Sequence, residues 1–147
     1  MGKLLAIDYG KKRVGIAATD ELQIAANALS TLPPAEALTF LQRYAADHKV
    51  EAVVVGMPVN LNGQPAAAAA GARNFAARLK KLLPDVEVDT FDERFTSKLA
   101  MQAILEAGVK KMARRNKELV DRVSACIMLQ SYMEHRKMIV NQKKVHD

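Results

Sequence analysis

The fold follows from residues 3–19, which read KLLAIDYGKKRVGIAAT. This stretch contains two short apolar runs, Lys3–Asp8 and Val14–Thr19, separated by the polar turn Tyr9–Lys12. Short apolar runs bounded by turn residues are typical of β-strands. Because too few residues separate the runs for a helical crossover, we expect an antiparallel hairpin.

The rest of the chain adds one more strand to this hairpin and then alternates between helix and strand patterns. Further strands are expected over Ile24–Leu32, Glu51–Gly56 and Val86–Phe91, and helices from Ala35, over Ala66–Leu83, from Thr96 or Ser97 to Ala107, and over Lys117–Met138. The order β-β-β-α-β-α-β-α-α predicts an α/β fold. It has a mixed five-stranded sheet, with a three-stranded antiparallel meander plus two parallel strands, and helices on both faces. We expect one domain over residues 1–138 and a polar tail over 139–147.

The helical spacing of apolar residues also predicts which side chains face the core. The buried stripe expected for the 66–83 helix consists of Ala72, Phe75, Leu79 and Leu82. That of the last helix consists of Val120, Val123 and Ile127.

Composition narrows the class of protein. Half of the 147 residues are apolar, which excludes disordered and collagen-like chains. No run approaches 18 consecutive apolar residues, so no membrane helix is expected, and nothing at the start resembles a signal peptide. The single cysteine, Cys126, cannot form an internal disulfide. We therefore expect a cytoplasmic protein.

The net charge of +6 is concentrated in the last third of the chain. Residues 101–147 hold ten basic and five acidic side chains, whereas the two preceding segments of fifty residues are nearly balanced. The densest part, Lys110–Lys117, contains Lys110, Lys111, Arg114, Arg115 and Lys117. Such a run fits either a solvated loop or a contact with an anionic partner.

Three carboxylates are candidates for chemistry. Asp8 ends the first strand, Glu93 follows the strand that ends at Phe91, and Asp121 lies near the start of the last helix. Each also has an ordinary structural interpretation: a turn residue, an ion pair with Arg94, and a side chain stabilised by the helix dipole. The predicted topology can bring all three to one edge of the sheet, where their mutual repulsion would require a cation. Oxygen ligands without a His or Cys cluster point to Mg²⁺ or Mn²⁺.

Carboxylates that hold such ions are suited to phosphodiester hydrolysis, because the ions lower the pKa of the attacking water and stabilise the leaving oxygen. No histidine is required as general base. The spacing of His48, His135 and His146 suggests no metal site, and we expect all three to face solvent. Cys126 lies between apolar neighbours, which favours packing over catalysis.

Four blocks of sequence carry a family resemblance. They are Asp8–Gly15, Val55–Pro58 with Asn60–Gly63, Asp92–Ser97, and Asp121–Ala125 continuing to Leu129–Tyr132. With these blocks in this order over nearly the whole chain, the sequence resembles the YqgF (RuvX) family. Its members are bacterial RNase H-like proteins described as Holliday-junction resolvases and as pre-16S rRNA processing nucleases.

The resemblance implies an RNase H-like fold with Asp8, Glu93 and Asp121 as the acidic active-site and metal-binding positions. It places Arg13 and Arg94 near the phosphates or the carboxylates. The basic residues of 110–117 connect the elements that carry Glu93 and Asp121, so they could hold flanking phosphates.

The leading hypothesis is a metal-dependent nuclease acting on structured RNA, in 5′-end maturation of 16S rRNA, with the ribosome or its precursors as a partner. One alternative is a Holliday-junction resolvase acting on branched DNA, which would favour a twofold dimer over a monomer. Another is a non-catalytic RNA-binding or transcription-associated factor.

Overall fold

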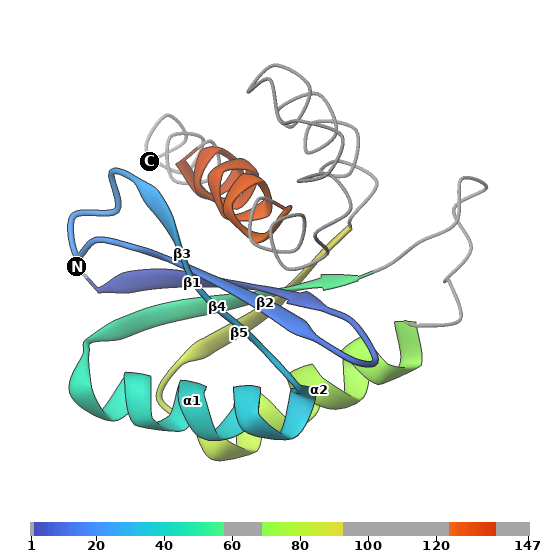
Figure 1. Ribbon diagram of the computed structural model, residues 1–147. Coiled ribbons are helices and arrows are strands. Elements are labelled where there is room, and N and C mark those ends of the chain that lie inside the picture. The colour runs from blue at the N-terminus through green and yellow to red at the C-terminus, as the bar shows by residue number, and fades with distance from the viewer. Residues whose placement is uncertain (1, 58–68, 93–123, 138–147) are drawn as a thin grey trace, which may run out of the picture.

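A computed structural model describes residues 2–57, 69–92 and 124–137 (Figure 1). The labelled elements are β1 (Lys3–Tyr9), β2 (Val14–Thr19), β3 (Ala26–Leu32), α1 (Pro34–Asp47), β4 (Val50–Met57), α2 (Ala69–Leu82) and β5 (Glu87–Asp92). Residues 124–137 form a further helix. The helix expected from Thr96 or Ser97 to Ala107 and the tail expected over 139–147 lie outside the described residues.

The strands form one mixed sheet in the order β3-β2-β1-β4-β5. β1 pairs antiparallel with β2 and parallel with β4, β2 pairs antiparallel with β3, and β4 pairs parallel with β5. The predicted meander plus two parallel strands is therefore confirmed. β1 is the central strand, and its carboxyl end lies at the same edge of the sheet as the carboxyl ends of β4 and β5.

The sheet is covered on both faces (Figure 1). On one face, Leu5, Ile7 and their neighbours pack against the apolar sides of α1 and α2. On the other face, Leu4, Ala6, Ala17, Ala52 and Val54 pack against the 124–137 helix. Because successive side chains of a strand point to opposite faces, β1 supplies both cores in alternation.

Three details of the packing differ from the sequence-based expectation. The side chain of Leu82, at the end of α2, was expected to be buried but is 39% exposed. Leu83, four residues after Leu79, is buried in its place. In the 124–137 helix Ile127 is only partly buried, because the helix contacts the sheet through Ala125, Met128, Leu129, Tyr132 and Met133. Val120 and Val123 lie outside the described residues.

The third strand begins two residues later than expected. Ile24 was assigned to it but lies in the turn before β3, where its N–H donates a 2.7 Å hydrogen bond to Asp20 Oδ1. This side-chain cap holds the backbone at Ile24 away from the ladder with β2. In the part of the chain that the structure describes, no helix is long and apolar enough to cross a membrane.

Candidate functional site

Asp8 lies at the carboxyl end of the central strand β1. The strand alternation places it on the face of Leu4 and Ala6, both buried under the 124–137 helix. Asp8 itself is only partly buried, because it lies where β1 leaves this packed region. Asp8 therefore has a backbone held within the central strand and a carboxylate with partial access to solvent, which it needs to remain charged.

Glycines occupy the positions beside Asp8 on both neighbouring strands. Gly15 of β2 is its partner in the antiparallel ladder. On the parallel side Ile7 pairs with Val55, which puts Gly56 of β4 next to Asp8, and Gly56 in turn pairs with Phe91 of β5. Aligned residues of adjacent strands point to the same face, so neither neighbouring strand places a side chain against the Asp8 carboxylate. On the Asp8 face of the sheet, the positions on either side of the carboxylate therefore carry only hydrogen atoms, although both glycines are buried.

Gly56 is not among the site residues predicted from the sequence. The signal that could have found it is the parallel pairing of the 3–8 and 51–56 strands. In that pairing Asp8, the sixth residue of the first strand, lies beside Gly56, the sixth residue of the second. Only the register makes this visible, because Asp8 and Gly56 are far apart in the sequence.

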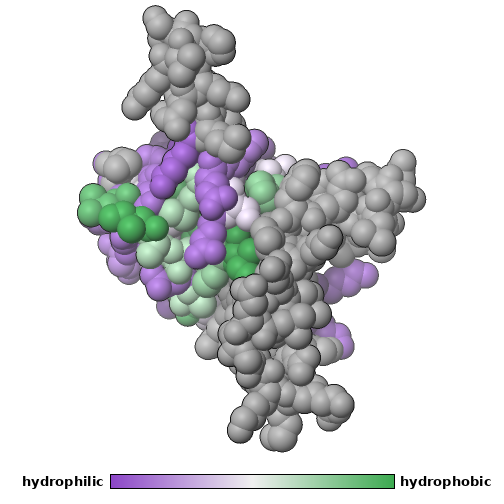
Figure 2. All heavy atoms as spheres, turned by 90° about the horizontal axis from the view of Figure 1, so that it is seen from above, coloured by the Kyte–Doolittle hydropathy of each residue, from purple (hydrophilic) through white to green (hydrophobic). Residues whose placement is uncertain are grey.

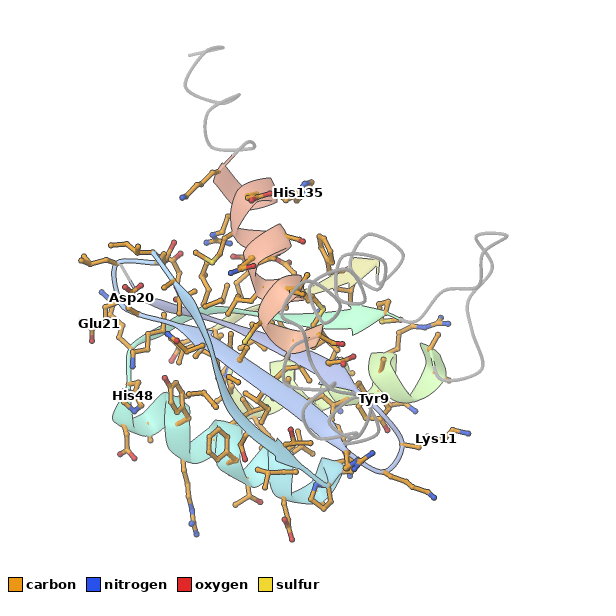
Figure 3. The ribbon with its side chains drawn as sticks, turned by 45° about the horizontal axis from the view of Figure 1, so that its top comes forward. Tyr9, Lys11, Asp20, Glu21, His48 and His135 are labelled. Atoms are coloured by element: carbon orange, nitrogen blue, oxygen red, sulfur yellow. The ribbon has the colours of Figure 1, made fainter. Side chains whose placement is uncertain are left out.

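The turn between β1 and β2 brings positive charge to the Asp8 end of the sheet. Lys11 and Lys12 are exposed, and Arg13 is partly buried. Gly10 permits this tight turn, since a Cβ there would lie 2.7 Å from the carbonyl oxygen of Arg13. At the opposite end of the sheet, the β2–β3 turn carries the exposed acids Asp20 and Glu21 (Figure 3). This polarity favours an anionic ligand at the Asp8 end.

Tyr9 holds the carboxyl end of β1 in place from the face of the sheet that α1 and α2 cover. Its ring packs against Phe75 of α2, with centroids 5.5 Å apart, and lies directly against Gly71. Since Tyr9 follows Asp8 in the chain, this contact restrains the backbone on which the carboxylate is carried.

A polar network holds the 124–137 helix in a defined direction. Arg136 donates hydrogen bonds of 2.9 Å to Glu51 and 2.8 Å to Glu87, at the amino ends of β4 and β5. Tyr132 donates a 2.7 Å hydrogen bond to Asp89. The carboxyl end of the helix therefore lies at the amino ends of these strands, and residue 124 points toward the sheet edge where Asp8 lies.

The same network shifts the protonation of its members. The hydrogen bond from Gln23 lowers the pKa of Glu51, as does Arg136, and together they outweigh partial burial. Burial and the hydrogen bond to Asp89 raise the pKa of Tyr132. Although burial opposes it, the interactions of Arg136 with Glu87 and Tyr132 raise its pKa. These directions keep Glu51 ionised, Tyr132 neutral and Arg136 positively charged near neutral pH.

The other predicted site residues lie outside the described residues: Glu93, Arg94, Lys110, Lys111, Arg114, Arg115, Lys117 and Asp121. Within the described part, no three His, Cys, Asp or Glu side chains form a metal-binding group. Of the histidines, His48 and His135 are exposed as expected, and His146 is not described. Cys126 packs against the core between the sheet and the 124–137 helix, and burial raises the pKa of its thiol.

A groove of about 560 Å³ runs along α1, lined by residues that include Phe40, Arg43, Tyr44 and His48. Tyr44 stacks on His48 at a centroid distance of 4.2 Å, and Lys3 Nζ donates to the Tyr44 hydroxyl at 3.2 Å. Because α1 covers the face opposite Asp8, this groove is separate from the candidate site.

The fold and the placement of Asp8 define an α/β protein of the RNase H-like class, with an acidic residue at the end of the central strand. Two solved structures share this fold. One is described as Thermus thermophilus RuvC, with a TM-score of 0.52, and the other as T. thermophilus RuvC in complex with a Holliday junction substrate, with a TM-score of 0.51. Each is 16% identical to this chain, and the match covers 90% of this chain and 96% of the RuvC chain.

The sequence model of the RuvX family, described as Holliday junction resolvase, matches residues 2–135, and the chain belongs to this family. Two similar relatives are provisionally named pre-16S rRNA nuclease. The Flavobacterium johnsoniae protein is 47% identical over 93% of this chain and 99% of its own length. The Phocaeicola vulgatus protein is 49% identical over 95% of this chain and 100% of its own length. The resemblance inferred from the four sequence blocks is thereby confirmed.

Proposed function

We propose that this protein is a metal-dependent nuclease that hydrolyses phosphodiester bonds in structured RNA, at the 5′ end of the 16S rRNA precursor. The observation that carries the proposal is the row Gly15–Asp8–Gly56, in which a partly buried carboxylate lies at the carboxyl end of the central strand between two residues without side chains. The names of the relatives supply the substrate, and the basic β1–β2 turn is consistent with a polyanion.

The topology supports a site completed by Glu93 and Asp121. β5 ends at Asp92, one residue before Glu93, and is two strands away from β1, or about 10 Å at the usual strand spacing. The 124–137 helix points its first residue toward the same edge, and Asp121 precedes that residue by three positions. We therefore assign Asp8, Glu93 and Asp121 as the acidic site residues.

Carboxylate oxygens are the donors that Mg²⁺ and Mn²⁺ prefer, so Asp8, Glu93 and Asp121 fit either ion. When bound, the ions would supply acidity to the attacking water and positive charge to the phosphate. Asp8 would orient this chemistry on the rigid central strand. Arg13 and Arg94, with the basic residues of 110–117, would hold phosphates on either side of the scissile bond. Water then adds to phosphorus, the bond to the leaving oxygen breaks, and that oxygen takes up a proton.

We further propose that the protein acts in the cytoplasm on the ribosomal precursor. The family description and the RuvC fold make branched DNA the competing substrate. One experiment separates the two: purified protein with Mn²⁺ or Mg²⁺ is given a 16S precursor 5′ fragment and, in parallel, a four-way DNA junction. We expect cleavage of the RNA.

The controls are two matched carboxylate variants. Asp8→Asn should abolish cleavage while RNA affinity is retained. Asp47→Asn, an exposed position at the end of α1 on the other face, should remain fully active. Cleavage of the junction alone would assign the resolvase function. RNA binding without cleavage under either ion would indicate a non-catalytic RNA-binding factor.

A further inference from the structure

The edge strand β3 is a surface that the proposed nuclease activity does not use. Within the described residues β3 pairs only with β2, so one side of its backbone offers unpaired N–H and C=O groups. Proteins usually protect such edges with Lys, Pro or a bulge. The sequence of β3, ANALSTL, has no Lys or Pro, and its protection is limited to a bulge at Leu29.

Exposed apolar side chains accompany this edge. Among the described residues, four large apolar side chains are exposed, and three of them lie on β3 or the turn before it: Leu22 at 65%, Ile24 at 70% and Leu29 at 37%. Figure 2 shows exposed apolar atoms at the left edge of the molecule, on the side where Figure 1 has the β2–β3 turn.

The turn that carries Leu22 and Ile24 is held in one conformation. Asp20 Oδ1 accepts a hydrogen bond from the Ile24 N–H, and Gln23 Nε2 donates to the Gly2 carbonyl at 2.8 Å and to Glu51 at 3.0 Å. Gln23 adopts a left-handed backbone with φ 57°, which its inward-facing side chain stabilises. A fixed turn presents its apolar side chains to a partner with little further loss of conformational entropy.

The absence of charged residues on this surface favours a second copy of the chain as its partner. From Leu22 to Ala35 the chain carries no Asp, Glu, Lys, Arg or His. A twofold contact brings each side chain close to its own copy, so an uncharged surface suits self-association in a molecule whose net charge of +6 otherwise opposes it. Nucleic acid does not fit the turn, because the exposed charges that precede Leu22 in the chain are the acids Asp20 and Glu21.

We propose that a second copy of this chain binds the surface formed by Leu22, Ile24 and the free edge of β3, with the two β3 strands antiparallel about a twofold axis. Three side chains supply only part of the roughly 800 Å² per partner of a standard interface, so main-chain pairing along β3 is an essential component. The two five-stranded sheets become one sheet of ten strands.

This arrangement has a geometric consequence for Asp8. The two β1 strands are five strand spacings apart, or about 24 Å. A twofold axis perpendicular to the sheet keeps both Asp8 residues on the same face, and the antiparallel direction places them at opposite ends of the strands. The dimer therefore presents two separate sites on one side.

The test is sedimentation velocity over a range of protein concentrations. The wild type should dimerise, and Ile24→Asp or Leu29→Asp should weaken dimerisation by roughly tenfold or more. The matched control is Leu82→Asp on α2, which removes a side chain of similar exposure (39%) away from β3 and should leave association unchanged. Because all three positions are exposed, thermal unfolding should show folded variants. A wild type that is monomeric at high micromolar concentration overturns the proposal, as does equal weakening by Leu82→Asp.

A second measurement locates the contact. In a Cys126→Ser background, cysteines are introduced singly at Asn27, Ala28 and Leu29, and the position nearest the twofold axis should form an intermolecular disulfide on mild oxidation, because only there does antiparallel pairing place a residue opposite its own copy. Ala70→Cys, exposed on α2, is the control. Equal cross-linking through position 70 would contradict the assigned surface.

Discussion

A Cβ atom added to Gly71 would lie 2.8 Å from Cε1 of Tyr9 and 3.0 Å from its hydroxyl oxygen. The ring of Tyr9 therefore occupies the space that any other residue at position 71 would need. We expect Gly71→Ala to destabilise the protein by about 1–3 kcal/mol, as overpacking does, despite the higher helix propensity of Ala. The free energy of unfolding from urea titration measures this.

The contact between Tyr9 and Gly71 also predicts that the effect of Gly71→Ala on the free energy of unfolding changes sign when the Tyr9 ring is removed. In a Tyr9→Leu background the ring is absent, so Gly71→Ala should become neutral or stabilise by up to about 1 kcal/mol. If Gly71→Ala destabilises both backgrounds equally, the Tyr9 ring is not the group that requires glycine.

The glycine beside Asp8 on β4 predicts an effect on cleavage. Gly56→Ala would place a methyl group on the Asp8 face of β4. We expect cleavage to fall by about ten- to a hundredfold, because small displacements of a reacting group have large effects on rate. Single-turnover cleavage should show the loss, while circular dichroism and thermal unfolding verify that the variant is folded. Full activity of the folded Gly56→Ala variant would contradict the steric interpretation.

The polar network predicts a pH dependence of stability. Because the pKa of Glu51 lies below its ordinary value of 4.5 in the folded protein, its ionised carboxylate stabilises the fold above that value. This contribution is lost as the pH falls through the folded-state pKa. Glu51→Gln should therefore lower the free energy of unfolding at pH 7, and the difference from the wild type should vanish in acid. Denaturant titrations from pH 7 to pH 3 measure it, and a difference that does not change with pH would exclude the ionised carboxylate as its source.

Cys126 should react slowly with alkylating reagents. Burial raises the pKa of its thiol above the ordinary value of 9.0, so little thiolate is present near neutral pH. Iodoacetamide labelling followed by mass spectrometry should be slow in the native protein and fast in urea. Rapid labelling of the native protein at pH 7 would indicate an accessible thiolate.

The basic segment predicts a salt effect. Lys110→Gln with Lys111→Gln should weaken RNA binding and reduce the slope of log K against log salt by roughly 1–2 units, if both residues contact phosphate. Replacing Lys80 and Lys81, two exposed lysines of α2, with Gln removes the same charge elsewhere and should leave the slope unchanged. Equal slopes for both pairs would assign residues 110–117 to a solvated loop.

Local patterns predicted the sheet because the hairpin and the two later strands each carry their own signal. The spacing within Lys3–Thr19 leaves room only for a turn, and Val53–Val55 form a β-branched run typical of a strand buried on both faces. Asp8 was found for the same reason, since it is the charged residue that ends the apolar run of the first strand.

What the sequence did not predict depends on contacts between distant segments. Leu82 and Leu83 both continue a helical stripe, and only the docking of α2 on the sheet selects Leu83. Gly56 became a site residue through the register of β1 with β4. Ile24 was placed in a strand because the bond from its N–H to Asp20 Oδ1 has no signature in the apolar pattern.

Because Ala6, Ala17 and Ala52 lie on one face of the sheet, the two faces differ in the substitutions that they tolerate. The α1 and α2 face is filled by large side chains such as Leu5 and Ile16, where one aliphatic residue can replace another of similar volume. Under the 124–137 helix a methyl group is the largest side chain that these three positions hold, and any enlargement pushes the helix away from the sheet. Random mutagenesis with selection for a folded protein should therefore recover many substitutions on the first face and almost none at the three alanines. At these three positions the face that carries Asp8 therefore has less freedom to diverge than the face covered by α1 and α2.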